Sequence, residues 1–195
     1  VQEAYSSVDV SIQNPPTENF DSILAGGIAG FNQGTLSEVA FDGEVTGPVA
    51  GGISGFNDSS IVDAYSLGAV NSRTIAGGIT GKNQGTFSRV YAAGVVTLTG
   101  EGDVAALVAD TIRSDIGGAS YWDESVLGQI SDVHGEALDA NAMRTQSSFE
   151  GWDFSDTGPW TIQSSGFRSY PYLRAFTYDA PEIEPPVRSI PGLQA

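Results

Sequence analysis

The chain has 195 residues, of which 24 are acidic and eight are basic, so its formal net charge is −16. This charge argues against binding to nucleic acids or to anionic membranes, because both need a Lys/Arg surface. Cysteine is absent, which excludes disulfides, thiolate metal sites and cysteine nucleophiles. No apolar run approaches the ~18 residues of a spanning helix, and no segment has the pattern of a signal peptide. We therefore expect the sequence to begin inside a longer protein or after processing.

The sequence repeats itself. Three copies and a degenerate fourth begin at Ala25 (AGGIAGFNQGTLSEVAFDGEVTG), Ala50 (AGGISGFNDSSIVDAYSLGAVNS), Ala76 (AGGITGKNQGTFSRVYAAGVVTL) and Ala105 (AALVADTIRSDIGGASYWD). The starts are 25, 26 and 29 residues apart, and all variation in length falls near the end of each copy. A half-copy at 4–10, AYSSVDV, matches the second half of the unit. Constant internal offsets with insertions at one corner predict a solenoid.

The unit has the pattern of β-strands, since glycine is too frequent for helices and apolar residues alternate. A turn is expected at the Asn of each copy, a second strand at Leu36–Phe41, and a third around Val45. Two inward ladders are predicted, Ile28/Ile53/Ile79/Val108 and Leu36/Ile61/Phe87/Ile116. The opposite rows, Ala25/Ala50/Ala76/Ala105 and Ala29/Ser54/Thr80/Ala109, predict a small, weakly polar face that is open to a partner.

These repeats resemble the GLUG motif through Gly26, Gly27, Gly30 and Asn32, their equivalents in later copies, and the segments Ala64-Tyr65 and Gly68-Ala69-Val70. The resemblance departs at Lys82, where the motif has an aromatic residue, and at Ala106-Leu107, which replace Gly-Gly. It extends over about residues 4–176, through Tyr121-Trp122-Asp123, Ala142-Met143-Arg144, Gly151-Trp152-Asp153-Phe154 and Tyr170-Pro171-Tyr172-Leu173. It implies a large secreted bacterial surface protein, as in filamentous-haemagglutinin-like adhesins and the non-catalytic parts of immunoglobulin-A-cleaving metallopeptidases.

The composition changes after residue 119, where aromatic residues gather and glycine becomes rarer. We expect this part to cap the open end of the solenoid, because aromatic side chains bury a large area. One short helix is predicted at 137–148, with Asp139 as its N-cap. The predicted organisation is a solenoid at 1–119 (units near 4–24, 25–49, 50–75, 76–104 and 105–125), a cap at 120–178 and a Pro-rich tail or linker at 179–195.

Residues that carry chemistry are few. The only histidine, His134, is interpreted as part of a polar loop, with a metal or acid/base role as the alternative. In the sequence the acids are scattered and out of register, which predicts a solvated surface. A carboxylate pair for glycan cleavage and calcium binding stay as alternatives. These acids are Glu38, Asp42, Glu44, Asp58, Asp63, Glu101 and Asp103. Asn57-Asp58-Ser59 is a glycosylation sequon by pattern only.

Six aromatic residues are candidates for a carbohydrate platform, although we expect most of them to form the core of the cap: Tyr121, Trp122, Trp152, Trp160, Tyr170 and Tyr172. No catalytic, metal or cofactor-binding residue is assigned, no cofactor is expected, and the ligand-binding residues are unknown. The expected fold is all-β, a short parallel β-helix (β-solenoid) with about 25-residue coils and an aromatic-rich cap that contains one short helix.

The predicted function is that of a non-catalytic adhesive or scaffolding module of a secreted bacterial cell-surface protein. Its expected partners are a host or matrix protein or a glycan, with no nucleic acid and no membrane insertion. The alternative is an accessory segment of a secreted hydrolase similar to the IgA-cleaving metallopeptidases, or a β-helix enzyme that degrades polysaccharides. Carboxylates clustered in a groove would favour the enzyme, and a smooth face of small residues would favour the module.

Overall fold

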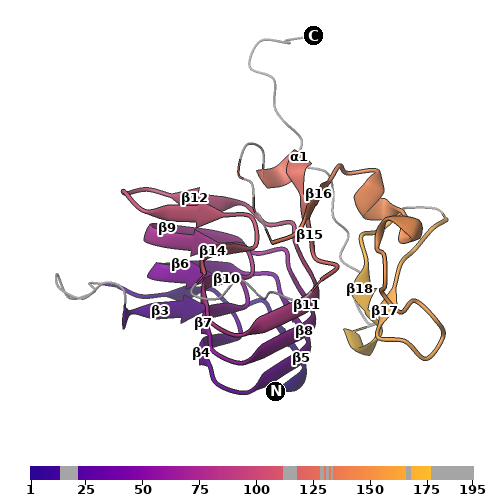
Figure 1. Ribbon diagram of the computed structural model, residues 1–195, viewed down its shortest axis with the longest axis horizontal. Helices are drawn as coiled ribbons and strands as arrows, with labels where there is room; N and C mark the ends of the chain where they lie inside the picture. The colour runs from indigo at the N-terminus through magenta and orange to yellow at the C-terminus, as the bar shows by residue number, and fades with distance from the viewer. Residues whose placement is uncertain are drawn as a thin grey trace, which may run out of the picture.

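Each repeat unit forms one coil whose strands join three different parallel sheets, as predicted for a β-solenoid (Figure 1). The computed structural model describes residues 1–13, 22–111, 118–127, 130, 132, 134–165 and 168–176. The coils stack from the N-terminus at the bottom of Figure 1 toward the top. The predicted Pro-rich tail at 179–195 lies outside the described residues.

Sheet A is the longest stack and runs the full height of the solenoid. Its order is β1 (Gln2–Ser6), β5 (Thr35–Phe41), β8 (Ser60–Ser66), β11 (Thr86–Ala92), β15 (Tyr121–Asp123) and β16 (Glu136–Leu138). The second strand of the unit, expected at Leu36–Phe41, is therefore confirmed as β5. Because β15 and β16 continue the parallel pairing, sheet A extends into the segment that we had assigned to the cap.

Sheets B and C form the other two sides of the coil. Sheet C contains β4 (Ala29–Asn32), β7 (Ser54–Asn57), β10 (Thr80–Asn83) and β14 (Val108–Thr111). Sheet B contains β2 (Val10–Ser11), β6 (Glu44–Gly51), β9 (Ala69–Gly77) and β12 (Val96–Leu98), with β3 (Leu24–Gly26) beside β6 and β13 (Asp103–Ala105) beside β9. The third strand, expected around Val45, is longer than predicted because β6 runs on into the next unit.

The first strand of each unit is broken at the Gly-Gly pair, which the alternation pattern did not predict. β3 ends at Gly26 and β4 begins at Ala29, so that the chain passes from sheet B to sheet C between them. A Cβ on Gly51 would lie 2.1 Å from the Ser54 carbonyl oxygen, and one on Gly77 would lie 2.0 Å from that of Thr80. In the three regular copies glycine permits this sharp corner, and its repetition places the corner at one position in each of these coils.

This corner reverses the orientation that we expected for the Ala row. Ala25, Ala50 and Ala76 belong to the hydrophobic core, and Ser54 and Thr80 are fully buried, so the prediction of an open small-residue face is wrong. Small residues are needed there because sheets B and C approach closely. The backbone nitrogen of Ala25, for example, lies 2.7 Å from where a Cβ on Gly55 would be. That row is therefore unavailable to a partner.

The predicted inward ladders are confirmed over the regular coils. Ile53, Ile79, Leu36, Ile61 and Phe87 are all at most 2% exposed, whereas Ile28 in the first coil is only partly buried. Leu36 pairs in register with Ile61, and Ile61 with Phe87. The last member of the second ladder, Ile116, lies outside the described residues.

The fourth copy is shifted by one residue from the predicted alignment. Ala76 pairs with Val104 and Thr80 with Val108, so Leu107 rather than Val108 follows Ile79, although Val108 is also buried. By the same register, Ala105 and Ala106 occupy the positions of the Gly-Gly pair, whereas the sequence comparison had assigned Ala106 and Leu107 to them. The shift arises at the corner where length varies, because the chain leaves sheet B after β12 and re-enters it at β13.

The predicted helix at 137–148 is wrong in its position and type. Ala137 and Leu138 belong to β16, and two 3₁₀ turns follow, η2 (Ala142–Arg144) and η3 (Gln146–Ser148). The predicted N-cap, Asp139, is not at that position, which Asn141 occupies before η2, although Asp139 Oδ1 accepts hydrogen bonds from the backbone N–H groups of Asn141 and Ala142. The short α-helix is α1 (Glu124–Leu127), and the chain continues through β17 (Trp160–Thr161), its antiparallel partner β18 (Tyr172–Leu173) and η4 (Arg174–Phe176).

Truncation of Ile53 to alanine tests the central ladder. Ile53 is fully buried between the coils, so its loss removes apolar contacts and leaves a cavity that the stacked backbone fills poorly. We expect Ile53→Ala to lower the free energy of unfolding by about 2–5 kcal/mol in urea denaturation. The matched control is Val95→Ala, at a side chain 54% exposed, for which we expect a change within about 0.5 kcal/mol. Equal losses in the two variants would contradict the register.

Candidate functional site

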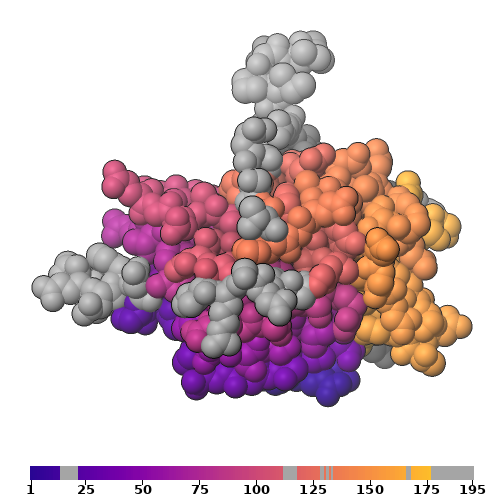
Figure 2. Space-filling view, viewed as in Figure 1, coloured from indigo at the N-terminus to yellow at the C-terminus, as the bar shows by residue number. Residues whose placement is uncertain are grey.

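The outward-facing row of side chains on sheet A is mainly aromatic, and the C-terminal segment packs against this face of the sheet. In register, Tyr5 is followed by Ala40, Tyr65, Tyr91 and Tyr121. The C-terminal segment lies beside β5, β8 and β11, and in the space-filling view it packs directly against the coils (Figures 1 and 2). The segment that we expected to close the end of the stack therefore mainly covers a side of it.

The contact between the two layers is a continuous cluster of buried side chains. The rings of Tyr65 and Tyr91 are stacked, with centroids 5.2 Å apart and planes 6° from parallel. Trp152 and Trp160 lie against them from the cap, with their centroids 4.2 Å apart. The cluster consists of Ala40, Tyr65, Tyr91, Tyr121, Leu138, Met143, Phe149, Trp152, Trp160, Tyr170 and Leu173.

A column of left-handed residues places the polar anchors of this junction. Five residues along sheet A have a positive φ between 51° and 57°: Glu3 in β1, Glu38 in β5, Asp63 in β8, Arg89 in β11, and Ala119 two residues before β15. The pairs on either side of them align the first four at one register position, and extension of the β11–β15 register by two residues puts Ala119 there too. Left-handed geometry costs a non-glycine residue about 1–2 kcal/mol, so we infer that the contacts made by this column offset a local strain.

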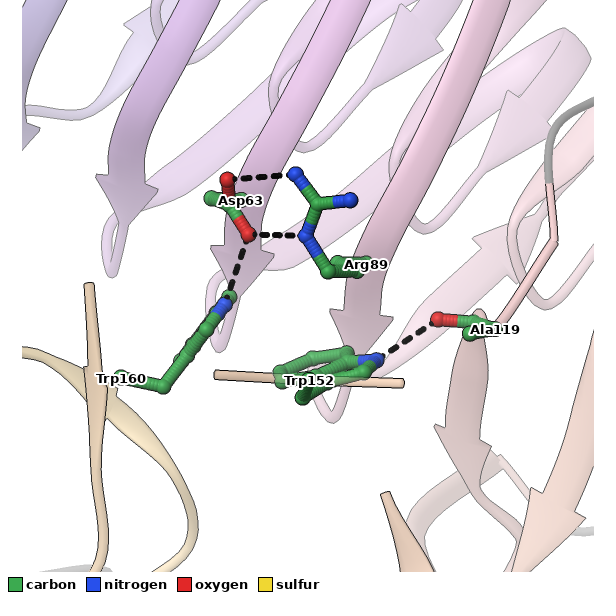
Figure 3. Close-up of polar contacts among 5 residues, drawn as sticks. All are labelled: Asp63, Arg89, Ala119, Trp152 and Trp160. Carbon is green, nitrogen blue, oxygen red and sulfur yellow. Dashed lines mark hydrogen bonds and ion pairs between the residues drawn. The ribbon is translucent and has the colours of Figure 1, made fainter. Parts of the chain in front are cut away.

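Asp63 is the centre of these contacts (Figure 3). Its carboxylate accepts hydrogen bonds from Arg89 Nε at 2.6 Å and Nη2 at 2.8 Å, and from the Trp160 indole Nε1–H at 2.9 Å. Asp63 is only 8% exposed, and the bidentate fork is the strong form of an Arg–carboxylate pair. The hydrogen bond with Asp63 raises the pKa of Arg89, so the guanidinium stays charged and satisfies the buried acid.

Further hydrogen bonds join the cap to sheet A or to the segment beside it. The Trp152 indole Nε1–H donates to the carbonyl oxygen of Ala119 at 2.8 Å (Figure 3). The Tyr91 hydroxyl donates to the Pro171 carbonyl oxygen at 2.7 Å, and the Tyr170 hydroxyl donates to the buried Asp123. Burial raises the pKa of both tyrosines, which keeps these hydroxyls protonated as donors.

The six candidate aromatic residues are thus mainly structural, as the core interpretation predicted. Tyr121, Trp152, Trp160 and Tyr170 belong to the junction cluster, and each is at most 8% exposed. Trp122 lies in the core of the solenoid instead, and Tyr172 is half-buried. Ring faces so enclosed are not available to stack on sugars, and the platform hypothesis is therefore not supported at these positions.

The column of left-handed residues corrects our view of the acids. Glu3, Glu38 and Asp63 stand in register in three adjacent strands, whereas the sequence had suggested that the acids were out of register. Sequence reasoning also missed Arg89 as an anchor. The signal was present, because Asp63 and Arg89 share one offset in consecutive copies and carry opposite charges. No group of three or more His, Asp or Glu side chains within the described residues is placed to hold a metal ion.

Asp132 closes the C-terminal end of sheet C. In the lower coils two consecutive amides donate to one carbonyl of the next coil, as Ile53 N and Ser54 N do to the Ile79 oxygen. In the last coil the equivalent amides, those of Leu107 and Val108, both donate to Asp132 Oδ2, at 2.8 and 2.6 Å. A side-chain carboxylate therefore takes the place of the carbonyl that a further coil would provide.

His134 belongs to the same closure. Its backbone N–H donates to Asp132 Oδ1 at 2.8 Å, and its Nε2 lies 2.9 Å from the Thr111 hydroxyl at the end of β14. These contacts agree with the polar-loop interpretation. Within the described residues, His134 belongs to no group of three or more His, Asp or Glu side chains that could hold a metal ion, so the metal alternative gains no support here.

A buried ladder of asparagines runs up sheet C. Asn32 Nδ2 donates to Asn57 Oδ1, and Asn57 Nδ2 donates to Asn83 Oδ1, each at 2.7 Å. Asn32 is 4% exposed, and the other two are fully buried. The chain bends within two residues after each Asn, as the turn prediction required. Because the Asn57 amide is enclosed and fully engaged, the sequon at this position is not accessible to glycosylation in the folded protein.

Exposed apolar side chains mark the two ends of the stack. At the N-terminal end are Val1, Tyr5, Val8 and Phe31, between 45% and 68% exposed. At the other end Val95, directly before β12, and Val104, within β13, are 54% and 38% exposed. These ends, rather than the cap aromatics, are the candidate contact surfaces.

No family model, no curated protein and no solved structure matches this chain. No helix in the described ranges is long and apolar enough to cross a membrane.

A double-mutant cycle tests the anchor between Asp63 and Trp160. Trp160→Phe removes the indole donor and leaves a buried carboxylate one partner short, so we expect a loss of about 1–3 kcal/mol in the free energy of unfolding. In the Asp63→Asn background the same change should cost less, with a coupling of about 0.5–3 kcal/mol. As a control, Thr99→Val removes a hydrogen bond in sheet B and should add to Asp63→Asn without coupling. Additivity of the first pair would disprove the anchor.

Replacement of Asp132 tests the closure of sheet C. Asp132→Ala leaves the amides of Leu107 and Val108 without an acceptor, and we expect about 1–3 kcal/mol of destabilisation and faster hydrogen exchange at these two amides. Asp132→Asn keeps a side-chain oxygen and should recover most of the loss. If the Ala and Asn variants exchanged at the same rates as the parent, Asp132 would have no closing role.

Proposed function

We propose that this chain is a non-catalytic adhesive or scaffolding module of a secreted bacterial cell-surface protein. The observation that supports the proposal is that the polar side chains most suited to catalysis form structural hydrogen bonds within the fold. Asp63 and Asp123 hold the cap, and Asp132 and His134 close the last coil. Each is bonded within the fold, and this supports a role in architecture rather than in turnover.

The stacked construction also suits a scaffold. Ladders of like residues and hydrogen bonds between coils run along the stack, and the cap locks several strands of sheet A along one side. Repeat architectures of this kind present extended rigid surfaces, on which binding residues lie at fixed spacing. The module would hold its exposed ends and faces in a constant arrangement toward a host protein, a matrix protein or a glycan.

The charge distribution adds a condition on where such a module works. Four arginines are engaged within the fold: Arg89 binds Asp63, and Arg144, Arg168 and Arg174 donate to backbone carbonyl oxygens of the cap. The first 49 residues contain seven acids and no Lys or Arg. The acidic surface is therefore poorly compensated, and its repulsion is relieved by ions at the strength of extracellular media.

A joint binding and turnover assay tests the proposal. The protein is applied to arrays of glycans and matrix proteins, and the same ligands, with acidic and neutral polysaccharides and peptides, are incubated with it and searched for products. We expect saturable binding to at least one ligand class without product formation. Turnover that disappears in Glu38→Gln or Asp42→Asn would overturn the non-enzyme proposal and support the polysaccharide-degrading alternative.

Thermal unfolding in salt tests the role of the charge. We expect the melting temperature to rise with sodium chloride, because screening weakens repulsion between acids within ~8–10 Å. Calcium chloride at matched ionic strength separates two mechanisms. An equal rise means screening alone, and a larger rise means that carboxylates bind the cation. A melting temperature that is flat or falls in both salts would show that the acids are too widely spread to strain the fold.

A further inference from the structure

Two arginines of the cap donate hydrogen bonds to each other's backbone. The Arg144 Nε–H donates to the Arg168 carbonyl oxygen at 3.2 Å, and Arg168 Nη2 donates to the Arg144 carbonyl oxygen at 2.9 Å. Arg144 also donates from Nη1 to the Ala140 oxygen at 2.7 Å, and its guanidinium lies over the Tyr170 ring, 4.6 Å from the centroid. Arg168 Nη2 donates to Thr145 Oγ1 at 3.0 Å. Backbone, hydroxyl and ring contacts therefore hold the two guanidinium groups close together.

The positive charges of this pair are not neutralised by a carboxylate. Among the described residues, neither Arg144 nor Arg168 makes an ion pair, although the chain has 24 acids against eight basic residues. The acid closest in sequence, Asp139, accepts two backbone amides with its Oδ1. Arg144 is linked to the fully buried Asp123 through Tyr170, whose hydroxyl donates to that carboxylate. Because two like charges at close range repel each other, an anion bound by both arginines would relieve a repulsion within the cap.

The pair has donors left for an acceptor from outside the chain. Each guanidinium carries five N–H donors in a planar fork, which is more than the contacts above use. Arg168 is exposed and Arg144 is half-buried, so both can be reached from solvent. A planar carboxylate accepts two parallel N–H bonds from such a fork. The contacts that already hold the two side chains reduce the conformational entropy that binding would cost.

The surroundings of the pair favour a sugar as the carrier of this carboxylate. Neutral hydrogen-bonding side chains are exposed in the segments next to the two arginines: Asn141, Gln146, Ser147 and Gln163. No large apolar side chain is exposed in the described part of the cap, so an acidic peptide would find no pocket there for its other side chains. A dense polyanion is also disfavoured, since its remaining charges would meet a protein of net charge −16.

We propose that Arg144 and Arg168 form a binding site for the carboxylate of an otherwise uncharged saccharide, such as a hexuronic acid. The two guanidinium groups bind the carboxylate, and the neighbouring amide and hydroxyl side chains hydrogen-bond the sugar hydroxyls. The inference rests on the proposed binding role of the module and names its ligand class. Array binding that does not use this site would disprove the site alone, whereas absence of any array binding would disprove the proposed function.

The probe that tests the site is methyl β-D-glucuronide, titrated against the isotope-labelled protein and followed by NMR. We expect saturable shifts of the Nε–H signals of Arg144 and Arg168. Methyl β-D-glucoside, which lacks the carboxylate, and acetate, which lacks the sugar, should each bind at least about tenfold more weakly. Acetate binding as tightly as the glucuronide, or tighter binding of an acetylated Gly-Glu-Gly amide, would overturn the saccharide. No saturation at tens of millimolar glucuronide, or shifts confined to other residues, would overturn the site.

Matched charge removals locate the site. Arg168→Gln should weaken glucuronide binding by about tenfold or more, and Arg168→Lys, which keeps the charge without the planar fork, should recover only part of the loss. Arg73→Gln removes the same charge from an exposed position on β9 in sheet B and should leave binding unchanged. Thermal melts establish that the variants are folded, and the comparison of ligands on the parent protein needs no variant. Equal weakening by Arg168→Gln and Arg73→Gln would show that net charge, and not this site, attracts the ligand.

Discussion

The fold depends on one constraint, that residues one coil apart stand directly above one another. Because all three sheets are parallel and in register, each position of the repeat forms a column, and a column is stable only if its members suit the same surroundings. This explains the Ile and Leu/Phe ladders, the Gly corners and the buried asparagines together. The asparagine column satisfies its amides only because every coil supplies the same side chain at the same height.

The same constraint positions the cap. The column of left-handed residues gives the strands of sheet A the same backbone irregularity at one position. The residues in this column need not be alike, because their side chains lie outside the core. Asp63 and Arg89 therefore form a charged pair across two coils, and Trp160, 97 residues farther along than Asp63, completes it from the cap. Ala119, in the same column, receives Trp152. A local backbone feature, repeated by stacking, thus becomes the docking line for the C-terminal segment.

The sequence was most informative where the columns are regular. Constant offsets predicted the solenoid, the second strand and the buried Ile53, Ile79, Leu36, Ile61 and Phe87, because repetition reports structure directly. Prediction from the sequence failed where a column is interrupted. The Gly-Gly corner broke the alternation of inward and outward residues and turned the Ala row inward. The insertion before β13 shifted the alignment of the fourth copy. The residues at 137–148 favour a helix by propensity, but the start of this segment forms β16, which pairs with β15 instead. The Asp63–Trp160 anchor joins residues too distant for any local pattern to indicate.

Engineered disulfides test the in-register stacking most directly, because the chain has no cysteine of its own. Thr35 and Ser60 are paired neighbours on β5 and β8, whereas Thr35 and Val62 are two residues out of register. A parallel register places the first pair within the ~4.4–6.8 Å Cα separation that a disulfide requires, and the second pair beyond it. We therefore predict that Thr35→Cys/Ser60→Cys forms an intramolecular disulfide under mild oxidation and that Thr35→Cys/Val62→Cys does not. Preferential oxidation of the second pair would contradict the register on which the whole account rests.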